Sequence, residues 1–167
     1  MTNHASTFEG GCSCGGLRYR MLSRPLIVHC CHCSWCQRQT GTAFAVNALI
    51  EAERVEVLKG AVVEMTVDSP SGANQRIARC PDCQVAVWSY YLVLADDLGE
   101  AIRFIRVGTL DEPARLPPDV HIFTSSRQPW LTLPAGARIF DEYFVIKETW
   151  TADSFQRREA MIQKIRG

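Results

Sequence analysis

Short runs in which apolar and polar residues alternate make up much of this chain. Leu17, Tyr19 and Met21 alternate with Arg18 and Arg20, the period-two pattern of a strand with one buried face. Glycine- and proline-rich turns separate such runs at Gly10-Gly11, Gly15-Gly16, 69–72 and 116–119. The pattern predicts a mainly antiparallel β domain, with strands at 17–21, Leu26–Cys30, Ala43–Ile50, Val55–Lys59, Val62–Val67, Gln75–Arg79, Val85–Tyr91, Ile102–Val107 and Val120–Phe123.

One short segment early in the chain breaks the strand pattern. Residues Ser34–Thr40 precede Gly41, and Ser34 stands where a helix N-cap is expected. We therefore expect a short helix or turn here, directly after a group of cysteines and with its amide end toward them.

The end of the chain also departs from the strand pattern. Asp153, followed three residues later by Gln156, resembles a capping box at the start of a helix. Residues that could line one face of this helix are Phe155, Ile162 and Ile165. We expect one domain over residues 8–144 and a helical tail over 145–167 that packs on the domain or meets a partner.

Composition narrows the class of protein. The chain has 167 residues, 47% of them hydrophobic, which suffices for one domain with a core. Lys plus Arg equals Asp plus Glu at 18 each, so overall charge gives no reason to expect nucleic-acid binding. No apolar stretch is long enough to span a bilayer, and the first residues lack the pattern of a signal peptide. We expect a cytoplasmic protein with reduced thiols.

Eight cysteines supply the candidate chemistry. They fall into three motifs, Cys12-x-Cys14, Cys30-Cys31-x-Cys33-x-x-Cys36 and Cys80-x-x-Cys83. Ligand pairs on tight turns close a tetrahedron of thiolates around Zn²⁺, so metal binding is the favoured interpretation. A disulfide framework is the minor alternative in a reducing compartment. A thioredoxin-like redox role for Cys33-Ser34-Trp35-Cys36 rests on one weak motif.

The spacing of the motifs suggests two metal centres. A closed, structural four-thiolate site would use Cys12, Cys14, Cys80 and Cys83. A second site would have only three ligands and an open position for water or substrate, as catalytic zinc has: Cys31, Cys33 and Cys36. The spacing also allows Cys33 and Cys36 to pair with Cys80 and Cys83 as a ribbon-like site. Cys30 is the one cysteine outside the two proposed sites, and we expect it to be a small buried hydrophobe on the opposite face from Cys31.

The motifs together resemble one known family. Gly11-Cys12-Ser13-Cys14-Gly15-Gly16, Cys31-His32-Cys33-Ser34-Trp35-Cys36-Gln37-Arg38, Gly41-Thr42-Ala43-Phe44 and Arg79-Cys80-Pro81-Asp82-Cys83 are similar to the glutathione-dependent formaldehyde-activating enzymes, a family that includes centromere protein V. His121 to Ser126 and Gln128-Pro129-Trp130 resemble its last motif. One departure is Gln84, which stands where the family commonly has Gly and would be strained if its φ is positive.

The resemblance implies a β-tent fold and two zinc ions, one structural at the four-cysteine site and one at Cys31, Cys33 and Cys36. It also implies a carbon–sulfur lyase activity on S-hydroxymethylglutathione, which forms from glutathione and formaldehyde. Three anionic ligands lower the acidity of the metal, so delivery of a substrate thiolate is favoured over strong activation of water. The alternative is a zinc-stabilised binding module without catalysis, whose C-terminal helix contacts a partner.

Other side chains are weaker candidates. We expect His29 and His32 to be structural or surface residues, and a structural role is also favoured over an acid–base role for His121. Arginines that could bind a substrate carboxylate, although a solvated surface position is favoured for each, are Arg38, Arg79 and Arg127. Trp35 is expected to wall the pocket, whereas core positions are favoured for Phe44, Trp88 and Trp130. Loops 66–75 and 95–101 would shape the pocket.

Overall fold

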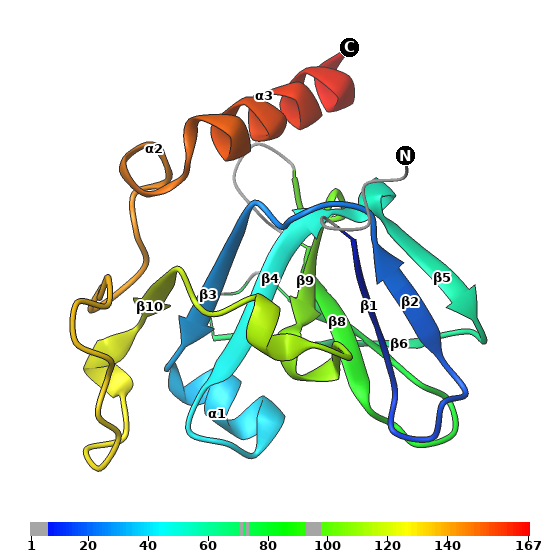
Figure 1. The fold of residues 1–167 in the computed structure, drawn as a ribbon, viewed down its shortest axis with the longest axis horizontal. Helices are drawn as coiled ribbons and strands as arrows, with labels where there is room; N and C mark the ends of the chain where they lie inside the picture. Colours follow the sequence, from blue (N-terminus) through cyan, green and yellow to red (C-terminus); the bar gives the residue numbers. More distant parts are fainter. Residues whose placement is uncertain (1–6, 71, 73, 93–97) are drawn as a thin grey trace.

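The computed structural model describes residues 7–70, 72, 74–92 and 98–167 (Figure 1). The strands among these residues form a three-stranded sheet, β1-β2-β5, and a seven-stranded sheet, β10-β3-β4-β9-β8-β7-β6. Their bounds are β1 Phe8–Gly11, β2 Arg18–Met21, β3 Ile27–Cys31, β4 Ala45–Glu51, β5 Val55–Lys59, β6 Val63–Val67, β7 Gln75–Arg79, β8 Ala86–Tyr91, β9 Ile102–Arg106 and β10 Val120–Ile122. The α-helices are α1 Ser34–Thr40, α2 Ile146–Thr149 and α3 Ala152–Arg166.

The expected mainly β fold with a C-terminal helix is confirmed. The strand pairs of both sheets are antiparallel except for β10, which joins β3 in parallel. Alternation of apolar residues placed β5 and β7 at the observed bounds, and the other predicted strands differ at their ends by one or two residues. The strand β1 was not predicted.

Two glycines explain why β1 was missed. Gly10 and Gly11 were predicted to form a turn, but both lie in the strand. A Cβ on Gly10 would lie 2.5 Å from the carbonyl oxygen of Thr109, and one on Gly11 would lie 2.3 Å from that of Leu17. Glycine therefore marks a close approach of backbones here rather than a reversal of the chain.

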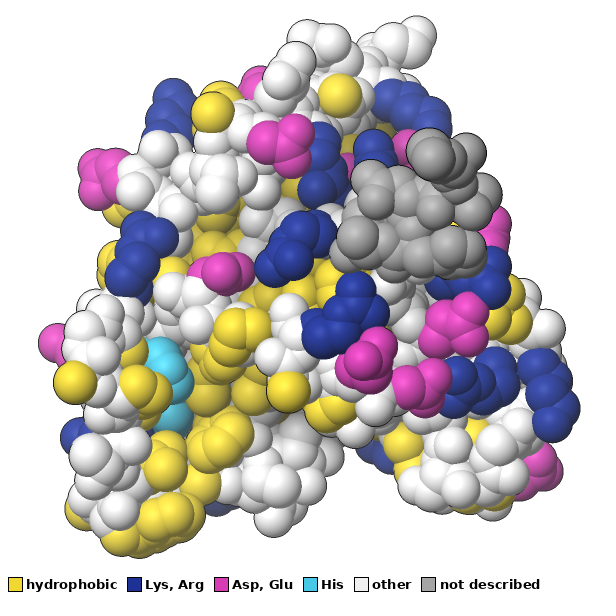
Figure 2. All heavy atoms as spheres, viewed as in Figure 1, with side chains coloured by type: hydrophobic (Ala, Val, Ile, Leu, Met, Phe, Trp, Pro, Cys, Tyr) yellow, Lys and Arg dark blue, Asp and Glu magenta, His cyan; other side chains and the backbone are white. Residues whose placement is uncertain are grey.

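The two sheets enclose the main hydrophobic core. Tyr19 and Met21 of β2 pack in one cluster with residues of the large sheet that point to the same side, among them Trp88 and Ile105. The Tyr19 and Trp88 rings meet edge to face with centroids 5.5 Å apart. Figure 2 shows Lys and Arg interleaved with Asp and Glu over the small sheet, where Arg20 pairs with Glu9.

The other face of the large sheet carries a second cluster. Leu49 and Phe104 pack there with Phe144, Met161 and Ile162 from the C-terminal segment, and α3 lies at the opposite end of the molecule from α1 (Figure 1). Helix α3 begins after Thr151, whose side chain caps the Ser154 N–H, so the cap predicted at Asp153 was wrong. Thr151 is the N-cap because its hydroxyl faces the first free amides of the helix.

Candidate metal centres and the adjoining cavity

Four cysteines from two distant turns converge on one point. Cys12 and Cys14 follow β1, and Cys80 and Cys83 occupy the turn between β7 and β8. All four sulfur atoms lie within 4.8 Å of one another, with Cys12 and Cys14 at 3.4 Å and Cys14 and Cys80 at 3.7 Å. The arrangement is a closed, soft donor set of the kind that holds structural zinc. This cluster can therefore hold a metal ion.

The turns around this cluster are shaped for it. The backbone N–H of Leu17 donates to Cys12 Sγ at 3.2 Å. Burial raises the pKa of Cys12, but the Leu17 N–H and the neighbouring thiols outweigh it and lower that pKa to about 6. After Cys83 the chain turns through Gln84 at φ 60°, and the Gln84 N–H donates to the Cys80 carbonyl at 3.1 Å. Gln84, which stands where the family commonly has glycine, therefore has the left-handed conformation that side chains disfavour.

Three further cysteines converge where β3 meets α1. Cys31 ends β3, Cys33 is the N-cap of α1, and Cys36 lies in its first turn. Their sulfur atoms also lie within 4.8 Å of one another. The predicted helix Ser34–Thr40 is confirmed, but its N-cap is Cys33, whose sulfur accepts the Cys36 N–H at 3.3 Å. The start of α1 therefore positions two of the three cysteines, Cys33 and Cys36.

The electrostatics of this cluster favour an anionic sulfur. Contacts with the Cys31 and Cys36 thiols, together with the N–H groups of Cys36 and Trp35, hold the pKa of Cys33 far below its ordinary value. The pKa of Cys31 is raised, first by its contact with Cys33 and then by Cys36 and burial. A cation among the three sulfurs would replace the shared protons. The residues present therefore fit a metal ion bound through soft thiolates.

The three-cysteine cluster borders a cavity of about 300 Å³. The four-cysteine cluster does not line this cavity. The wall beside Cys31, Cys33 and Cys36 is mostly aromatic and apolar, with residues Trp35, Pro70, Tyr91, Phe104, Ile122, Phe123 and Tyr143, and the polar residues His29, Ser34, Asn47 and Ser69. A molecule that enters this cavity would meet the cysteine sulfurs directly.

A chain of polar side chains forms part of the cavity wall. Arg106 donates to Asn47 Oδ1 at 2.6 Å, and Asn47 Nδ2 lies 3.2 Å from His29 Nε2. His29 is buried, with 3% of its surface exposed, and its Nδ1 has no hydrogen-bond partner among the described residues. Burial, and next the nearby Arg106, lowers the pKa of His29 to about 3. Neither His29 nor Asn47 was expected to line the site.

Cys30, His32 and His121 form a third group, on the other side of β3. Their ligand-type atoms lie within 4.8 Å of one another, and all three residues are buried. However, His32 Nε2 and His121 Nδ1 are 3.0 Å apart while the ring centroids are 5.3 Å apart. The rings thus meet edge to edge through one nitrogen each. This contact is a hydrogen bond between histidines rather than a pair of lone pairs aimed at a cation.

The last predicted motif holds the three-cysteine loop in place. His121 bonds His32, and the Gln37 side-chain amide donates to the carbonyls of His32 at 2.6 Å and Ser126 at 3.0 Å. Gln128 in turn donates to Gln37 Oε1 at 2.6 Å. His121 does not line the cavity, because in the β10–β3 pair it stands opposite Cys30 rather than Cys31. These residues position the cysteines without contacting the space beside them.

The four aromatic candidates have different environments. Trp35 lines the cavity, as predicted, and its Nε1 donates to Gln75 at 3.3 Å. Trp88 is in the core, as predicted. Trp130 is 72% exposed, so its predicted core position was wrong. Phe44 is half-buried and contacts the His32 ring at a centroid distance of 5.7 Å.

None of the three candidate arginines lines the cavity. Arg38 is exposed on α1, Arg79 donates to the Gln84 carbonyl, and Arg127 donates to the Leu131 carbonyl. The lining residues include no Lys or Arg among those the structure describes, and the sequence has neither at positions 1–6, 71, 73 and 93–97. Of the predicted pocket loops, Ser69 and Pro70 line the cavity. Positions 71, 73 and 95–97 lie outside the described residues.

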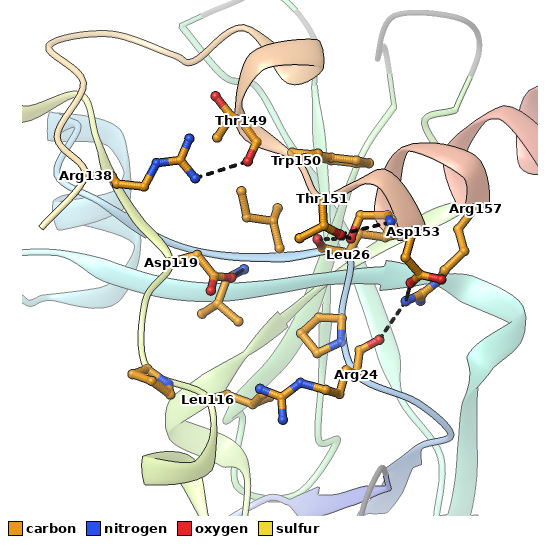
Figure 3. Close-up of a pocket in the computed structure, with 15 residues that line it drawn as sticks. Arg24, Leu26, Leu116, Asp119, Arg138, Thr149, Trp150, Thr151, Asp153 and Arg157 are labelled. Atoms are coloured by element: carbon orange, nitrogen blue, oxygen red, sulfur yellow. Dashed lines mark hydrogen bonds and ion pairs between the residues drawn. The ribbon is translucent and has the colours of Figure 1, made fainter.

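A second cavity, of about 340 Å³, lies between β3 and the C-terminal helices (Figure 3). Arg138 and Arg157 lie at its edge, but Arg138 donates to the Thr149 carbonyl and Arg157 to the Arg24 carbonyl. No cysteine lines it. The cavity beside Cys31, Cys33 and Cys36 is therefore the candidate functional site.

Comparisons with known proteins identify a family for most of the chain. Residues 7–126 match the family described as glutathione-dependent formaldehyde-activating enzyme. A Halomonas elongata protein named "Putative glutathione-dependent formaldehyde-activating enzyme" is 25% identical over 132 residues, which cover 75% of this chain and 80% of that protein. A crystal structure of a Rhodobacter sphaeroides protein is 14% identical, covers 79% of this chain and 98% of its own, and has a TM-score of 0.44.

Proposed function

The chain belongs to the glutathione-dependent formaldehyde-activating enzyme family, and we propose that it forms and cleaves the carbon–sulfur bond of a small thiol–aldehyde adduct. The observation that carries the proposal is the position of Cys31, Cys33 and Cys36 at the wall of an aromatic cavity. S-hydroxymethylglutathione is the substrate that the family name suggests.

We assign two zinc ions to the chain. Cys12, Cys14, Cys80 and Cys83 would hold a structural ion, because four thiolates complete a tetrahedron. The cavity cluster would hold the second ion with one position left for substrate. The ligand set of that cluster is Cys31, Cys33 and Cys36. When bound there, zinc supplies the positive charge that keeps a substrate thiol deprotonated near neutral pH.

The residues around the second site would prepare the substrate for reaction. In the cleavage direction the carbon–sulfur bond breaks, the sulfur keeps the electron pair as the thiolate, and the hydroxyl proton passes to bulk solvent as the carbonyl forms. The aromatic wall, including Trp35, Phe104 and Tyr143, would exclude water from the adduct. Residues of the last motif would keep the cysteines in register through Gln37 and His32.

The test compares zinc-loaded wild-type protein with Cys33→Ser and Cys30→Ala. Native mass spectrometry counts the zinc ions, and exchange NMR measures interconversion of S-hydroxymethylglutathione with glutathione and formaldehyde. We expect two zinc ions in the wild type, and Cys33→Ser to lose one ion and more than about a hundredfold of the rate. Cys30→Ala is the control and keeps both ions. Unchanged turnover in Cys33→Ser would refute the proposed site.

The alternative, a zinc-stabilised module without catalysis, predicts a different result. It requires one tightly held zinc ion and no acceleration of the exchange by the wild type. Helix α3 gives this alternative little support as a partner helix, because its Met161 and Ile162 are already buried against the large sheet.

A further inference from the structure

Three neighbouring strands contribute one polar residue each to a chain of contacts that reaches the cavity wall. In the sheet register, Asn47 of β4 stands opposite His29 of β3 on one side and Arg106 of β9 on the other. Arg106 donates to Asn47 Oδ1 at 2.6 Å, and Asn47 Nδ2 lies 3.2 Å from His29 Nε2. The chain of contacts ends at the cavity, which His29 and Asn47 line and Arg106 does not.

The chemistry of these groups fixes the proton on His29. A guanidinium group has donors only, so the oxygen of the Asn47 amide must face Arg106. The amide nitrogen therefore faces His29, and because this nitrogen only donates, His29 Nε2 accepts. The imidazole proton is then on Nδ1. Arg106 thus determines the tautomer of a histidine that it does not touch.

The donor on Nδ1 lacks an acceptor within the part of the chain that the structure describes. His29 Nδ1 is buried and has no hydrogen-bond partner among the described residues. Its ring lies between two aromatic neighbours, with centroids 5.9 Å from Phe104 and 6.4 Å from Tyr143. A buried donor without an acceptor is costly in a folded protein and calls for an explanation. A molecule in the cavity can supply the missing acceptor.

We propose that the Nδ1–H of His29 donates a hydrogen bond to the oxygen of the one-carbon group of the substrate, and that Asn47 and Arg106 are the residues that position it. The inference rests on the proposed function, because it assumes that a thiol–aldehyde adduct occupies the cavity. The same donor suits the hydroxyl oxygen of the adduct and the carbonyl oxygen of the aldehyde. It orients the carbon–oxygen bond and does not take the hydroxyl proton.

Asn47→Asp tests the inference with minimal change of shape. The carboxylate still accepts from Arg106, but its second oxygen now accepts from His29 Nε2, so the proton moves from Nδ1 to Nε2. In zinc-loaded protein, ¹⁵N NMR of the imidazole should report Nδ1–H in the wild type and Nε2–H in Asn47→Asp. Asn74→Asp, an exposed position outside the lining, is the matched control and should keep Nδ1–H.

Binding measurements locate the acceptor on the substrate. Titration by native mass spectrometry with glutathione alone, and with glutathione plus formaldehyde, measures the thiol and the adduct separately. We expect Asn47→Asp to weaken binding of the adduct by about tenfold to a hundredfold and binding of glutathione itself by less than about threefold. His29→Phe, which keeps an aromatic ring but has no donor, should give the same selective loss and serves if Asn47→Asp does not fold.

The outcomes separate the two proposals. If the wild type binds neither glutathione nor the adduct, the proposed function fails and this inference falls with it. If the wild type binds the adduct but Asn47→Asp and His29→Phe bind it equally well, only the role of His29 is overturned. An equal loss for glutathione and the adduct would also overturn it, because the donor would then not contact the one-carbon oxygen. An Nε2–H tautomer in the wild type would contradict the assigned geometry.

Discussion

At the scale of single residues, backbone conformations that side chains disfavour lie beside the candidate centres. Gln84 has φ 60° after Cys83, and Phe123 has φ 53° after β10. The turn at Gln84 closes the four-cysteine loop, and Phe123 ends at the cavity wall. Strained conformations of this kind persist where the surrounding structure requires them. Both of these strained residues therefore adjoin a candidate site.

Replacing Gln84 with glycine should relieve the strain next to the four-cysteine cluster. A residue with a side chain in the left-handed backbone conformation costs about 1 kcal/mol relative to glycine. We therefore expect the zinc-loaded Gln84→Gly variant to be more stable than Gln84→Ala by roughly 0.5 to 1 kcal/mol. The alanine variant is the matched control, because both variants lose the Gln84 hydrogen bond to the Pro81 carbonyl. Urea unfolding at fixed free zinc measures the difference. Equal stability of the two variants would show that the turn is unstrained.

At the scale of secondary-structure elements, a buried ion pair fastens α3 to the large sheet. Arg157 of α3 donates through Nε and NH2 to both oxygens of Glu51 at the end of β4, at 2.8 and 2.5 Å. The Glu51 side chain is 5% exposed and that of Arg157 15%. Burial raises the pKa of Glu51, but the hydrogen bonds from Arg157 outweigh this, and the net pKa lies below the ordinary 4.5.

This pair should make the stability of the protein depend on pH. Because the folded pKa of Glu51 is lowered, its contribution is present above the ordinary pKa of 4.5 and is lost as the pH falls through the folded pKa. We expect Glu51→Gln to cost roughly 3 kcal/mol at pH 7, and the gap from the wild type to narrow below about pH 4. Urea unfolding at several pH values measures the gap.

Two features of this experiment isolate the ion pair. Protonation of zinc ligands at low pH affects wild type and variant alike, so it cancels in the difference. Glu53→Gln removes an exposed partner of Lys164 and should change stability by less than about 0.5 kcal/mol. A gap that stays constant with pH would show that Glu51 is not held ionised by Arg157.

At the scale of the whole molecule, the two cysteine clusters have different relations to the fold. The four-cysteine cluster joins the turn after β1 to the turn between β7 and β8, so it links the small sheet to the large one. The three-cysteine cluster lies within one loop and faces a cavity. None of the helices in the described ranges has both the length and the apolar character that a bilayer span requires.

Removal of zinc should therefore occur in two stages. We expect a chelator to remove one ion first with little change in circular dichroism, and the second ion only as the protein unfolds. Cys36→Ser and Cys80→Ser are a matched pair of buried substitutions, 4% and 0% exposed in the wild type. Cys36→Ser should keep the fold and lose the first stage, whereas Cys80→Ser should unfold far more readily. A single cooperative release of both ions would contradict this difference.

The absence of Lys and Arg from the described part of the cavity wall predicts weak discrimination between thiols. Among the described lining residues no Lys or Arg is available to bind the carboxylates of glutathione. We expect the formaldehyde adduct of uncharged 2-mercaptoethanol to be cleaved with a kcat/KM within about tenfold of that of the glutathione adduct. Steady-state kinetics on both adducts checks this. A preference for the glutathione adduct of more than a hundredfold would show that a cation outside this wall binds the peptide.

The sequence by itself determined the strands other than β1 and the span of the short helix, and its cysteine spacing favoured the two observed groups. These features depend on side-chain period and on ligand spacing, both of which are local. Only the tertiary structure decided which cluster faces a cavity, because β10 and the C-terminal segment supply Ile122, Phe123 and Tyr143 from far along the chain.

The polar side of the cavity could also not be predicted. His29, Asn47 and Arg106 come from three strands, and their contacts depend on a strand register that no local pattern specifies. The roles of Gln37 and His121 likewise follow from the parallel pairing of β10 with β3. Local spacing therefore determines which residues can bind a metal, whereas long-range pairing of strands determines what the metal would face.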